Sequence, residues 1–356
     1  MLTNEYRTLS QSAHGVRRII ERVMENIRVD DDCVSPEPGA DSVGQQTPGA
    51  GKAVPGSMMA ALDMSRLHGD LRYGESLAEH TSWRVGGPAR VFYRPADRDD
   101  LVCFLRNLDP NEPVLWLGLG SNLLVRDGGF PGTVVATKGR LDVLRRVGER
   151  GLYAEAGCTC AKVARYAARN SLRGAEFLAG IPGTLGGALT MNAGAFGGET
   201  WPLVRSVETI DRFGTVRRRA PAEFGIGYRE VRAPRGEWFL TAHLMLEPGD
   251  TEDGQARIKS LLDRRSATQP IGQPSCGSTF RNPPVDHAAR LIEAAGLKGK
   301  RIGGAQVSEK HANFIINTGV ATAADIESLI ARVQSEVARQ FGIRLVTEVH
   351  RVGTPE

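Results

Sequence analysis

The sequence predicts a mixed α+β or α/β protein that contains more than one hydrophobic core. From about residue 75, short apolar runs that suit buried strands alternate with longer segments that show the 3.6-residue period of amphipathic helices. A chain of 356 residues is too long for one ordinary core. Its composition, with 41% hydrophobic and 24% charged residues, is that of a soluble globular protein.

Residues 1–70 are predicted to be an appendage to this body. Residues 14–29 have apolar side chains at positions i, i+3, i+4 and i+7, which predicts an amphipathic helix. Residues 31–57 contain no aromatic residue, leucine or isoleucine, and prolines interrupt them, which is the composition of a disordered linker. The role of the appendage is open, and Met58, Met59 and Met64 leave the true start site open as well.

The body is expected to contain strands and helices in turn. Short apolar runs predict strands at 91–93, 114–117, 133–136, 152–156, 204–210, 239–246 and about 343–352. Apolar residues at helical spacing predict helices at 99–108, 160–170, 255–265, 286–295 and 323–340.

Composition excludes several classes of function. The net charge of +4 is spread along the chain, which argues against a nucleic-acid partner, and Arg217–Arg219 are predicted to be a solvated strand end rather than a phosphate clamp. No run of about 18 apolar residues suggests a membrane span, and no signal-peptide core is present, so a cytoplasmic protein is expected. The five cysteines suggest no disulfide framework, and Cys158 and Cys160 are expected to be buried rather than to bind a metal.

Glycine-rich loops are the main functional signal. Residues 180–199 hold seven glycines in twenty positions, and residues 118–122 form a second Gly/Ser/Asn loop. The dinucleotide fingerprint G-x-G-x-x-G fails because position 123 is leucine, and no Walker sequence occurs. Glycine lets backbone N–H groups approach a ligand closely, and consecutive N–H groups bind anions. The loops could be simple turns, but together they suit a long ligand with a central diphosphate and a flat ring, such as an extended flavin dinucleotide.

Six motifs then carry a resemblance to a known family. They are His80–Ala89, Leu117–Leu124, Ile181–Gly197, Gly227–Arg229, Gly277–Pro283 and Glu348–Val349. Their residues and their order resemble those of the UDP-N-acetylenolpyruvoylglucosamine reductase family, from about residue 75 to the end. The resemblance implies an FAD-binding fold of the vanillyl-alcohol-oxidase/PCMH type, with two α/β subdomains at 75–140 and 141–250. It also implies a C-terminal α+β substrate-binding domain at 251–356, whose last strand returns toward the FAD-binding part.

The resemblance also implies a reaction. The family uses FAD, with NADPH as reductant, to reduce UDP-N-acetylglucosamine enolpyruvate to UDP-N-acetylmuramate in peptidoglycan precursor synthesis. By motif position, Arg229 would hold the substrate carboxylate, Glu348 would help to polarise it, and Ser278 would donate the proton. Without the family, each of these three residues would be interpreted as an ordinary structural or surface residue.

Other site residues follow from the same motifs. Substrate contacts are expected from Tyr228, Asn282 and His311, although some members carry Gln at the position of His311. The residues expected to bind FAD are Gly118, Gly120, Ser121, Asn122, Gly157, Ile181, Pro182, Gly183, Gly186, Gly187, Asn192 and Gly194. The expected partners are small molecules only, no metal is implied, and a monomer is expected.

One departure and two alternatives remain. Some members insert a loop before the helix at 255–265, and a tyrosine of that loop closes over the substrate. Residues 247–250 leave no room for it, so this chain resembles a shorter subclass in which another residue must close the site. The alternatives are another FAD-dependent oxidase or dehydrogenase of the same fold that acts on an alcohol or sugar, or a non-catalytic flavin-binding protein.

Overall fold

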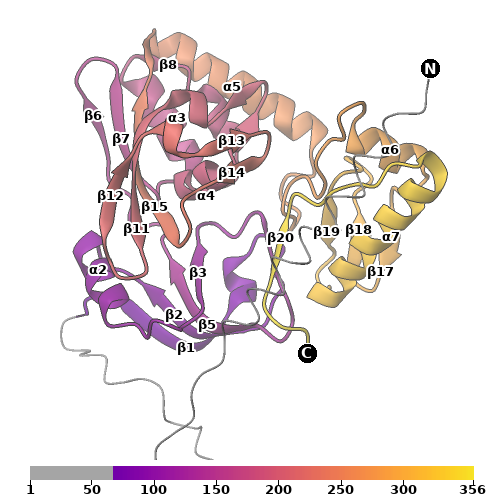
Figure 1. Cartoon of the computed structure of the whole chain (residues 1–356). Helices are drawn as coiled ribbons and strands as arrows, with labels where there is room; N and C mark the ends of the chain where they lie inside the picture. The colour runs from indigo at the N-terminus through magenta and orange to yellow at the C-terminus, as the bar shows by residue number, and fades with distance from the viewer. Residues whose placement is uncertain (1–66) are drawn as a thin grey trace, which may run out of the picture. The chain divides into compact units, whose positions relative to one another are not determined.

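A computed structural model describes residues 67–356 (Figure 1). The helix predicted at 14–29 and the linker predicted at 31–57 lie outside the described residues. All described residues belong to one unit of the chain, Ser57–Glu356. No helix among them is both long and apolar enough to cross a membrane.

The first sheet has the strand order β1-β2-β5-β3. Strand β1 (Asp70–Ser76) is antiparallel to β2 (Pro88–Arg94), whereas β5 (Phe130–Ala136) runs parallel to both β2 and β3 (Val114–Leu117). Helix α2 (Arg98–Arg106) packs on this sheet through an apolar face that includes Phe104, whose ring stacks on Tyr93 with 3.9 Å between centroids. The Asp97 carboxylate starts the helix by accepting a hydrogen bond from the Asp100 N–H.

The second sheet is antiparallel, with the order β12-β11-β15-β7-β6. Its strands are β6 (Leu144–Val147), β7 (Gly151–Glu155), β11 (Val204–Asp211), β12 (Val216–Arg219) and β15 (Glu237–Met245). Helices α3 (Cys160–Arg169), α4 (Leu185–Thr190) and α5 (Thr251–Thr268) complete its core. Small residues let α3 and α5 approach closely, because a Cβ on Gly254 would lie 3.0 Å from the Cβ of Ala168.

The C-terminal part is built on a small antiparallel sheet, β17 (Arg301–Ile302), β18 (Ala305–Val307) and β19 (Ile315–Asn317), with helices α6 (Ala288–Ala294) and α7 (Ala323–Phe341). Thr322 and Asp325 form a capping box at the start of α7, and Gly342 ends the helix with φ of 68°. The chain then returns, and β20 (His350–Val352) pairs in parallel with β4 (Leu123–Val125), as the yellow terminal segment in Figure 1 shows.

Short elements complete the chain. The two-residue strands β9 (Gly194–Ala195) and β10 (Gly198–Glu199) form one hairpin, and β13 (Gly225–Gly227) and β14 (Glu230–Arg232) form another. Strand β8 (Leu172–Arg173) pairs with β16 (Glu247–Pro248). The 3-10 helices are η2 (Leu77–His80), η3 (Glu176–Gly180), η4 (Trp201–Leu203) and η5 (Pro221–Glu223).

Most predicted elements agree with the structure to within a few residues, and the mixed α+β class is confirmed. The predicted closing strand at 343–352 is too long, because only 350–352 form a strand and Thr347 makes an isolated bridge to Phe280. The predicted solvated strand end at Arg217–Arg219 is the edge strand β12, where Arg217 and Arg219 form ion pairs with carboxylates that include Glu237. The domain boundaries at 140 and 250 stay predictions.

Candidate active site

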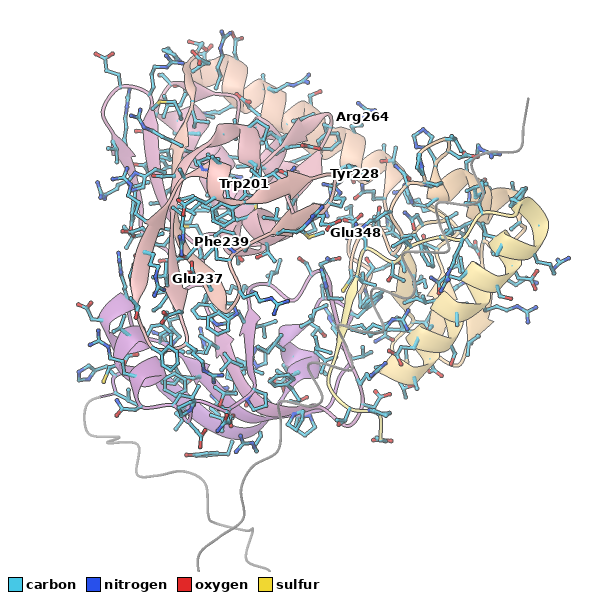
Figure 2. The ribbon with its side chains drawn as sticks, in the orientation of Figure 1. Trp201, Tyr228, Glu237, Phe239, Arg264 and Glu348 are labelled. Carbon is cyan, nitrogen blue, oxygen red and sulfur yellow. The ribbon has the colours of Figure 1, made fainter. Side chains whose placement is uncertain are left out.

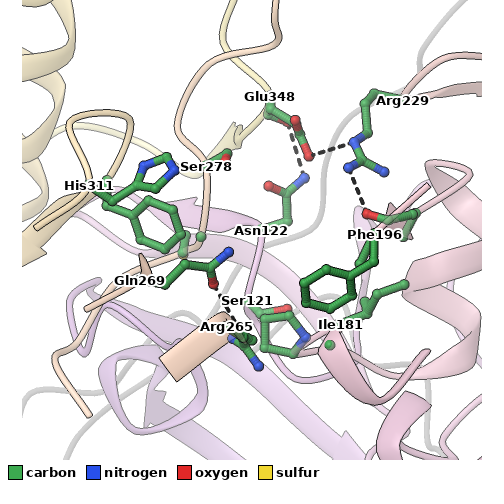
Figure 3. Close-up of a pocket in the computed structure, with 18 of the residues that line it drawn as sticks. Ser121, Asn122, Ile181, Phe196, Arg229, Arg265, Gln269, Ser278, His311 and Glu348 are labelled. Carbon is green, nitrogen blue, oxygen red and sulfur yellow. Dashed lines mark hydrogen bonds and ion pairs between the residues drawn. The ribbon is translucent and has the colours of Figure 1, made fainter. Parts of the chain in front are cut away.

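A cavity of about 590 Å³ lies among segments that are far apart in the sequence (Figure 3). Its walls come from the loop after β3, from η3 and the β9–β10 hairpin, from the end of α5, from residues 276–278 and from the chain before β20. All three residues predicted to be catalytic, Arg229, Ser278 and Glu348, line it. Figure 2 shows Tyr228, Arg264 and Glu348 in the same region, between α5, the β13–β14 hairpin and the last strand.

Arg229 enters the cavity from the turn of the β13–β14 hairpin. Its Nε lies 3.4 Å from Oε1 of Glu348, and its NH2 donates a hydrogen bond of 2.7 Å to the carbonyl of Gly194. The buried Nε forms no hydrogen bond, so a donor remains for a ligand. The φ angle of Arg229 is 54°, a left-handed conformation that costs a residue with a Cβ about 1–2 kcal/mol.

Glu348 is held by two walls of the cavity at once. Its N–H donates to the carbonyl of Thr279 at 2.8 Å, and its own carbonyl accepts from Nδ2 of Asn122 at 3.1 Å. Burial raises the pKa of the Glu348 carboxyl, and the charges of Arg229 and Arg281 oppose that rise. The carboxyl can therefore hold a proton more readily than an exposed glutamate.

Ser278 follows Gly277, which has a left-handed φ of 70°. The next N–H groups are fixed, because Thr279 donates to the carbonyl of Asn313 at 2.8 Å and Phe280 donates to Oδ1 of Asn313 at 3.0 Å. The Ser278 hydroxyl forms no hydrogen bond to any residue that the structure describes, although it lines the cavity. It is therefore free to meet a ligand.

A second cavity, of about 150 Å³, is lined by other residues of the same two glycine loops. Of the residues predicted to bind FAD, Gly118, Gly186 and Gly187 line this cavity. Five others line the larger cavity, namely Ser121, Asn122, Ile181, Pro182 and Gly194. The loops thus run along both cavities, as a long dinucleotide requires.

The residues of the smaller cavity fit one part of such a cofactor. The Trp116 ring stacks on Trp238 with 5.1 Å between centroids, and Nε1 of Trp116 is buried without a hydrogen-bond partner. A Cβ added to Gly187 would meet only Oγ1 of Thr184, at 3.7 Å, so the chain itself leaves space there. An orphaned donor and an open glycine surface both suit a bound polar ligand with a flat ring.

Four residues predicted to bind FAD line neither cavity, namely Gly120, Gly157, Gly183 and Asn192. A Cβ on Gly120 would lie 2.1 Å from the His80 carbonyl oxygen, so this glycine permits close backbone packing. Asn192 is 1% exposed, and its side chain bonds to Glu199, to the Gly227 carbonyl and to the Trp201 N–H. In this structure these four residues contribute to the shape of the loops around the site.

The three predicted substrate contacts lie in different places. His311 lines the large cavity with its ring edge-on to Phe314, and burial lowers its pKa, so the imidazole is neutral near pH 7. Tyr228 lies at the hairpin turn and lines a third cavity of about 180 Å³ beside Arg229. Asn282 lines none of these cavities, because its Oδ1 accepts a hydrogen bond from the N–H of Ala288 at the start of α6.

Sequence reasoning missed the contribution of α5. Arg264, Arg265 and Gln269 line the large cavity, and in Figure 3 Arg265 and Gln269 lie opposite the Arg229–Glu348 pair. The Nε of Arg265 donates to Oε1 of Gln269 at 3.0 Å, and Arg265 forms no ion pair with any described carboxylate. An arginine without an acidic partner suits an anionic ligand. Two adjacent arginines at the end of the predicted helix were the available signal, but the sequence did not show which face they occupy.

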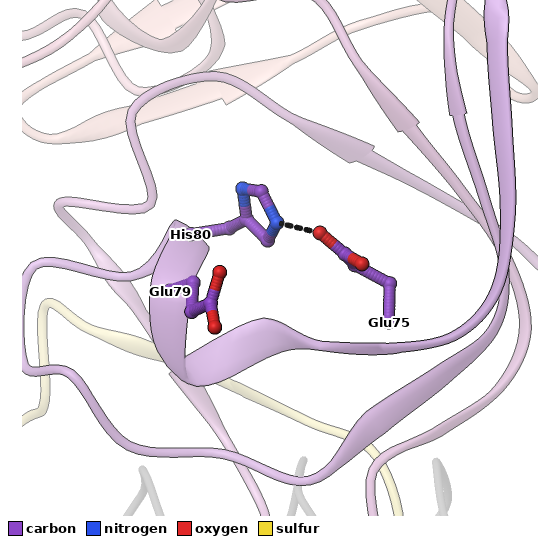
Figure 4. Close-up of side chains that lie close together, drawn as sticks. All are labelled: Glu75, Glu79 and His80. Carbon is purple, nitrogen blue, oxygen red and sulfur yellow. Dashed lines mark hydrogen bonds and ion pairs between the residues drawn. The ribbon is translucent and has the colours of Figure 1, made fainter.

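One group outside the cavities has metal-like spacing. Glu75, Glu79 and His80 bring one ligand atom each to within 4.8 Å of the others (Figure 4). However, Nε2 of His80 lies 2.8 Å from Oε1 of Glu75, and NH1 of Arg72 donates to the same oxygen at 2.8 Å. The Arg72 charge opposes a cation there, so we interpret the group as an ion-pair network that ties η2 to β1.

Comparisons with known proteins agree with this architecture. The family model described as "FAD binding domain" matches residues 89–219, and the model of the UDP-N-acetylenolpyruvoylglucosamine reductase C-terminal domain matches residues 269–352. A reductase of that name from Alkalilimnicola ehrlichii is 65% identical over 295 residues, which cover 83% of this chain and 99% of the relative. A reductase of the same name from Nitrosococcus oceani is 58% identical, and the match covers 83% of this chain and 100% of the relative.

A solved structure agrees as well. The crystal structure of the Thermus caldophilus reductase has 33% sequence identity and a TM-score of 0.69, and the match covers 80% of this chain and 99% of that one. The expected fold, an FAD-binding part of the vanillyl-alcohol-oxidase/PCMH type followed by a smaller α+β domain, is confirmed. The chain belongs to the UDP-N-acetylenolpyruvoylglucosamine reductase family of FAD-dependent oxidoreductases.

Proposed function

We propose that this chain reduces UDP-N-acetylglucosamine enolpyruvate to UDP-N-acetylmuramate, with FAD as bound cofactor and NADPH as reductant. The observation that carries the proposal is that Arg229, Ser278 and Glu348, from three separate parts of the sequence, line one cavity beside the glycine loops. When bound and reduced by NADPH, the flavin would supply the hydride that adds to the terminal carbon of the substrate alkene.

Arg229 stabilises the charge that develops in this reaction. After hydride addition, negative charge spreads from the neighbouring carbon into the substrate carboxylate. The planar guanidinium of Arg229, whose Nε forms no hydrogen bond within the protein, suits a two-point contact with that carboxylate, which a lysine could not make. Because Gly194 and Glu348 hold the guanidinium in advance, little reorganisation is needed as the charge forms.

Glu348 and Ser278 have complementary roles. A protonated Glu348 donates a hydrogen bond to the substrate carboxylate, whereas an ionised one would repel it, and the raised pKa of Glu348 favours the protonated form. Ser278 gives its hydroxyl proton to the carbon that carries the negative charge, which completes the addition of hydride and proton across the double bond, and solvent then returns a proton to the serine. A serine is a weak acid, but the carbon is very basic, so position decides the rate.

The site needs no second copy of the chain, because all three residues come from one chain. We therefore propose that the protein acts as a monomer, which size-exclusion chromatography with light scattering would test. We place the reaction in the cytoplasm because its nucleotide-sugar substrate and NADPH are cytoplasmic metabolites.

The proposed reaction is tested by NADPH consumption in FAD-loaded protein, with and without UDP-N-acetylglucosamine enolpyruvate. We expect consumption that depends on this acceptor and a lactyl ether as product. Ser278→Ala should leave the reduction of flavin by NADPH intact and slow its reoxidation by the acceptor. Ser171→Ala is the control, because that hydroxyl lies outside the cavities and contacts Thr251 at 3.2 Å. Protein that holds FAD but consumes no NADPH with the acceptor would exclude the reductase and favour an alcohol or sugar donor.

A further inference from the structure

The motif His80–Ala89 has no assigned role in the reaction, yet one of its residues lies directly behind the cavity wall. Ser82 contacts two loops that line the cavity further along. Its N–H donates to the Gly120 carbonyl at 3.1 Å, and its hydroxyl donates to the Ser275 carbonyl at 2.7 Å. Residues 121–122 and 276–278, which follow these contacts immediately, are cavity walls.

Cys276 completes the connection. Its Sγ lies 3.3 Å from the Ser82 hydroxyl, 3.7 Å from the Gly120 carbonyl oxygen and 3.5 Å from the Leu123 carbonyl oxygen. Burial raises the pKa of the Cys276 thiol to about 12, so the thiol stays protonated and can donate to one of these oxygens at a time. Ser82 therefore joins the two loops through its contacts with Gly120, Ser275 and Cys276, and the Cys276 thiol adds direct contacts between them.

This joint matters because Ser278 has a flexible neighbour. Gly277 has φ of 70°, and no atom lies within 4 Å of the position that its Cβ would take. The path of the chain into Ser278 is thus fixed only by contacts on either side. Asn313 holds the residues after Ser278, and the Ser82–Cys276 joint holds those before it.

We infer that Ser82 is a positioning residue, whose hydroxyl sets the place of the Ser278 proton donor relative to the loop of Ser121 and Asn122. The inference rests on the proposed function. Attachment of the C-terminal part to the body does not depend on Ser82, because the neighbouring Trp83 supplies it: its Nε1 donates to the Ile315 carbonyl at 2.7 Å, and its carbonyl accepts from Nδ2 of Asn317 at 2.9 Å.

The test separates the two half-reactions in FAD-loaded protein by anaerobic stopped-flow absorbance of the flavin. Ser82→Ala should leave flavin reduction by NADPH unchanged and slow reoxidation by UDP-N-acetylglucosamine enolpyruvate by about ten- to a hundredfold, the scale of a displaced catalytic group. The matched control is Thr81→Val. It removes an adjacent hydroxyl whose bond, 2.9 Å to the Val85 carbonyl, stays within its own turn. This variant should reoxidise at the wild-type rate.

A double-mutant cycle distinguishes positioning from general structural damage. In a Ser278→Ala background, Ser82→Ala should have no further effect on reoxidation, because there is no hydroxyl left to position. An equal slowing in both backgrounds, or no slowing in the wild-type background, would overturn the inference. Failure of the wild-type protein to reoxidise with the acceptor would instead contradict the proposed reaction, so the two failures are distinguishable.

Discussion

Gly187→Ala is expected to strengthen the fold and weaken FAD binding. Gly187 lies in the first turn of α4 and lines the smaller cavity. The added methyl group would meet only Oγ1 of Thr184, at the ordinary contact distance of 3.7 Å, so the protein without cofactor has room for it. A cofactor whose phosphates or ring approach the backbone at this point would lose that room.

The substitution is expected to raise the stability of the fold and to lower its affinity for FAD. Replacing glycine by alanine in a helix stabilises the fold by about 1 kcal/mol, because glycine loses more backbone entropy on folding. In a protein of this size that corresponds to a rise in Tm of about 2–4 °C. A methyl group forced into an occupied site costs about 1–3 kcal/mol, which raises the Kd for FAD about five- to 150-fold.

The assay is a titration of cofactor-free protein with FAD, followed by flavin fluorescence, together with thermal unfolding of the cofactor-free protein. Gly227→Ala is the matched control. Its Cβ would also be unhindered, with only the Glu230 carbonyl oxygen at 3.8 Å, but it lines neither FAD cavity and should leave the Kd unchanged. Gly186→Ala should destabilise the fold itself, because its Cβ would lie 2.9 Å from the Cβ of Ala156. An unchanged Kd for Gly187→Ala would refute the assignment of this loop to FAD.

Substitutions at three further positions test the site and the structure around it. Arg229→Gly and Arg229→Ala should both abolish acceptor-dependent turnover. The glycine variant should nevertheless be more stable to urea than the alanine variant by about 1 kcal/mol, because φ of 54° strains any residue with a Cβ. Equal stabilities of the two variants would contradict the strain. Because burial raises the pKa of Glu348, the stability that this residue contributes falls as the pH rises through its folded pKa. Glu348→Gln should therefore raise Tm at pH 8 but not at pH 4. A rise in Tm at pH 4 alone would mean that folding lowers the pKa of Glu348 instead of raising it. The Asp127 carboxylate accepts hydrogen bonds from the N–H groups of Ala323 and Ala324 at 2.8 and 2.9 Å. Asp127→Ala should therefore lower the free energy of unfolding in urea by about 1–2 kcal/mol. No change would show that solvent replaces the carboxylate.

Periodic segments could be predicted well from the sequence. In the last long helix, Ile326, Leu329, Ile330 and Val333 repeat at helical spacing, and all four are buried in α7. In the second sheet, the strand at 239–246 could be predicted because most of its residues are apolar. At the edge strand β12 the sequence predicted only a solvated strand end at Arg217–Arg219, because three adjacent arginines hide its alternation, and ion pairs rather than apolar contacts hold it.

The site depended on a different kind of signal. Ordered motifs pointed to Arg229, Ser278 and Glu348, and these residues do share a cavity. Neither Arg265 nor the capping role of Asn282 could be found in the same way. Each depends on which side chain a distant element presents, and that is set by packing rather than by local pattern.

The β13–β14 hairpin links the two cavities and carries the strained Arg229 at its turn. The hairpin turn holds Arg229 in the large cavity, whereas Val231 and Ala233, just beyond it, line the smaller one. A strained φ is kept only where the surroundings fix the conformation, and here the Gly194 carbonyl and the Glu348 carboxylate hold the guanidinium. A ligand in the smaller cavity would press on the same hairpin. Cofactor binding and the placement of the arginine are therefore expected to be coupled through these few residues.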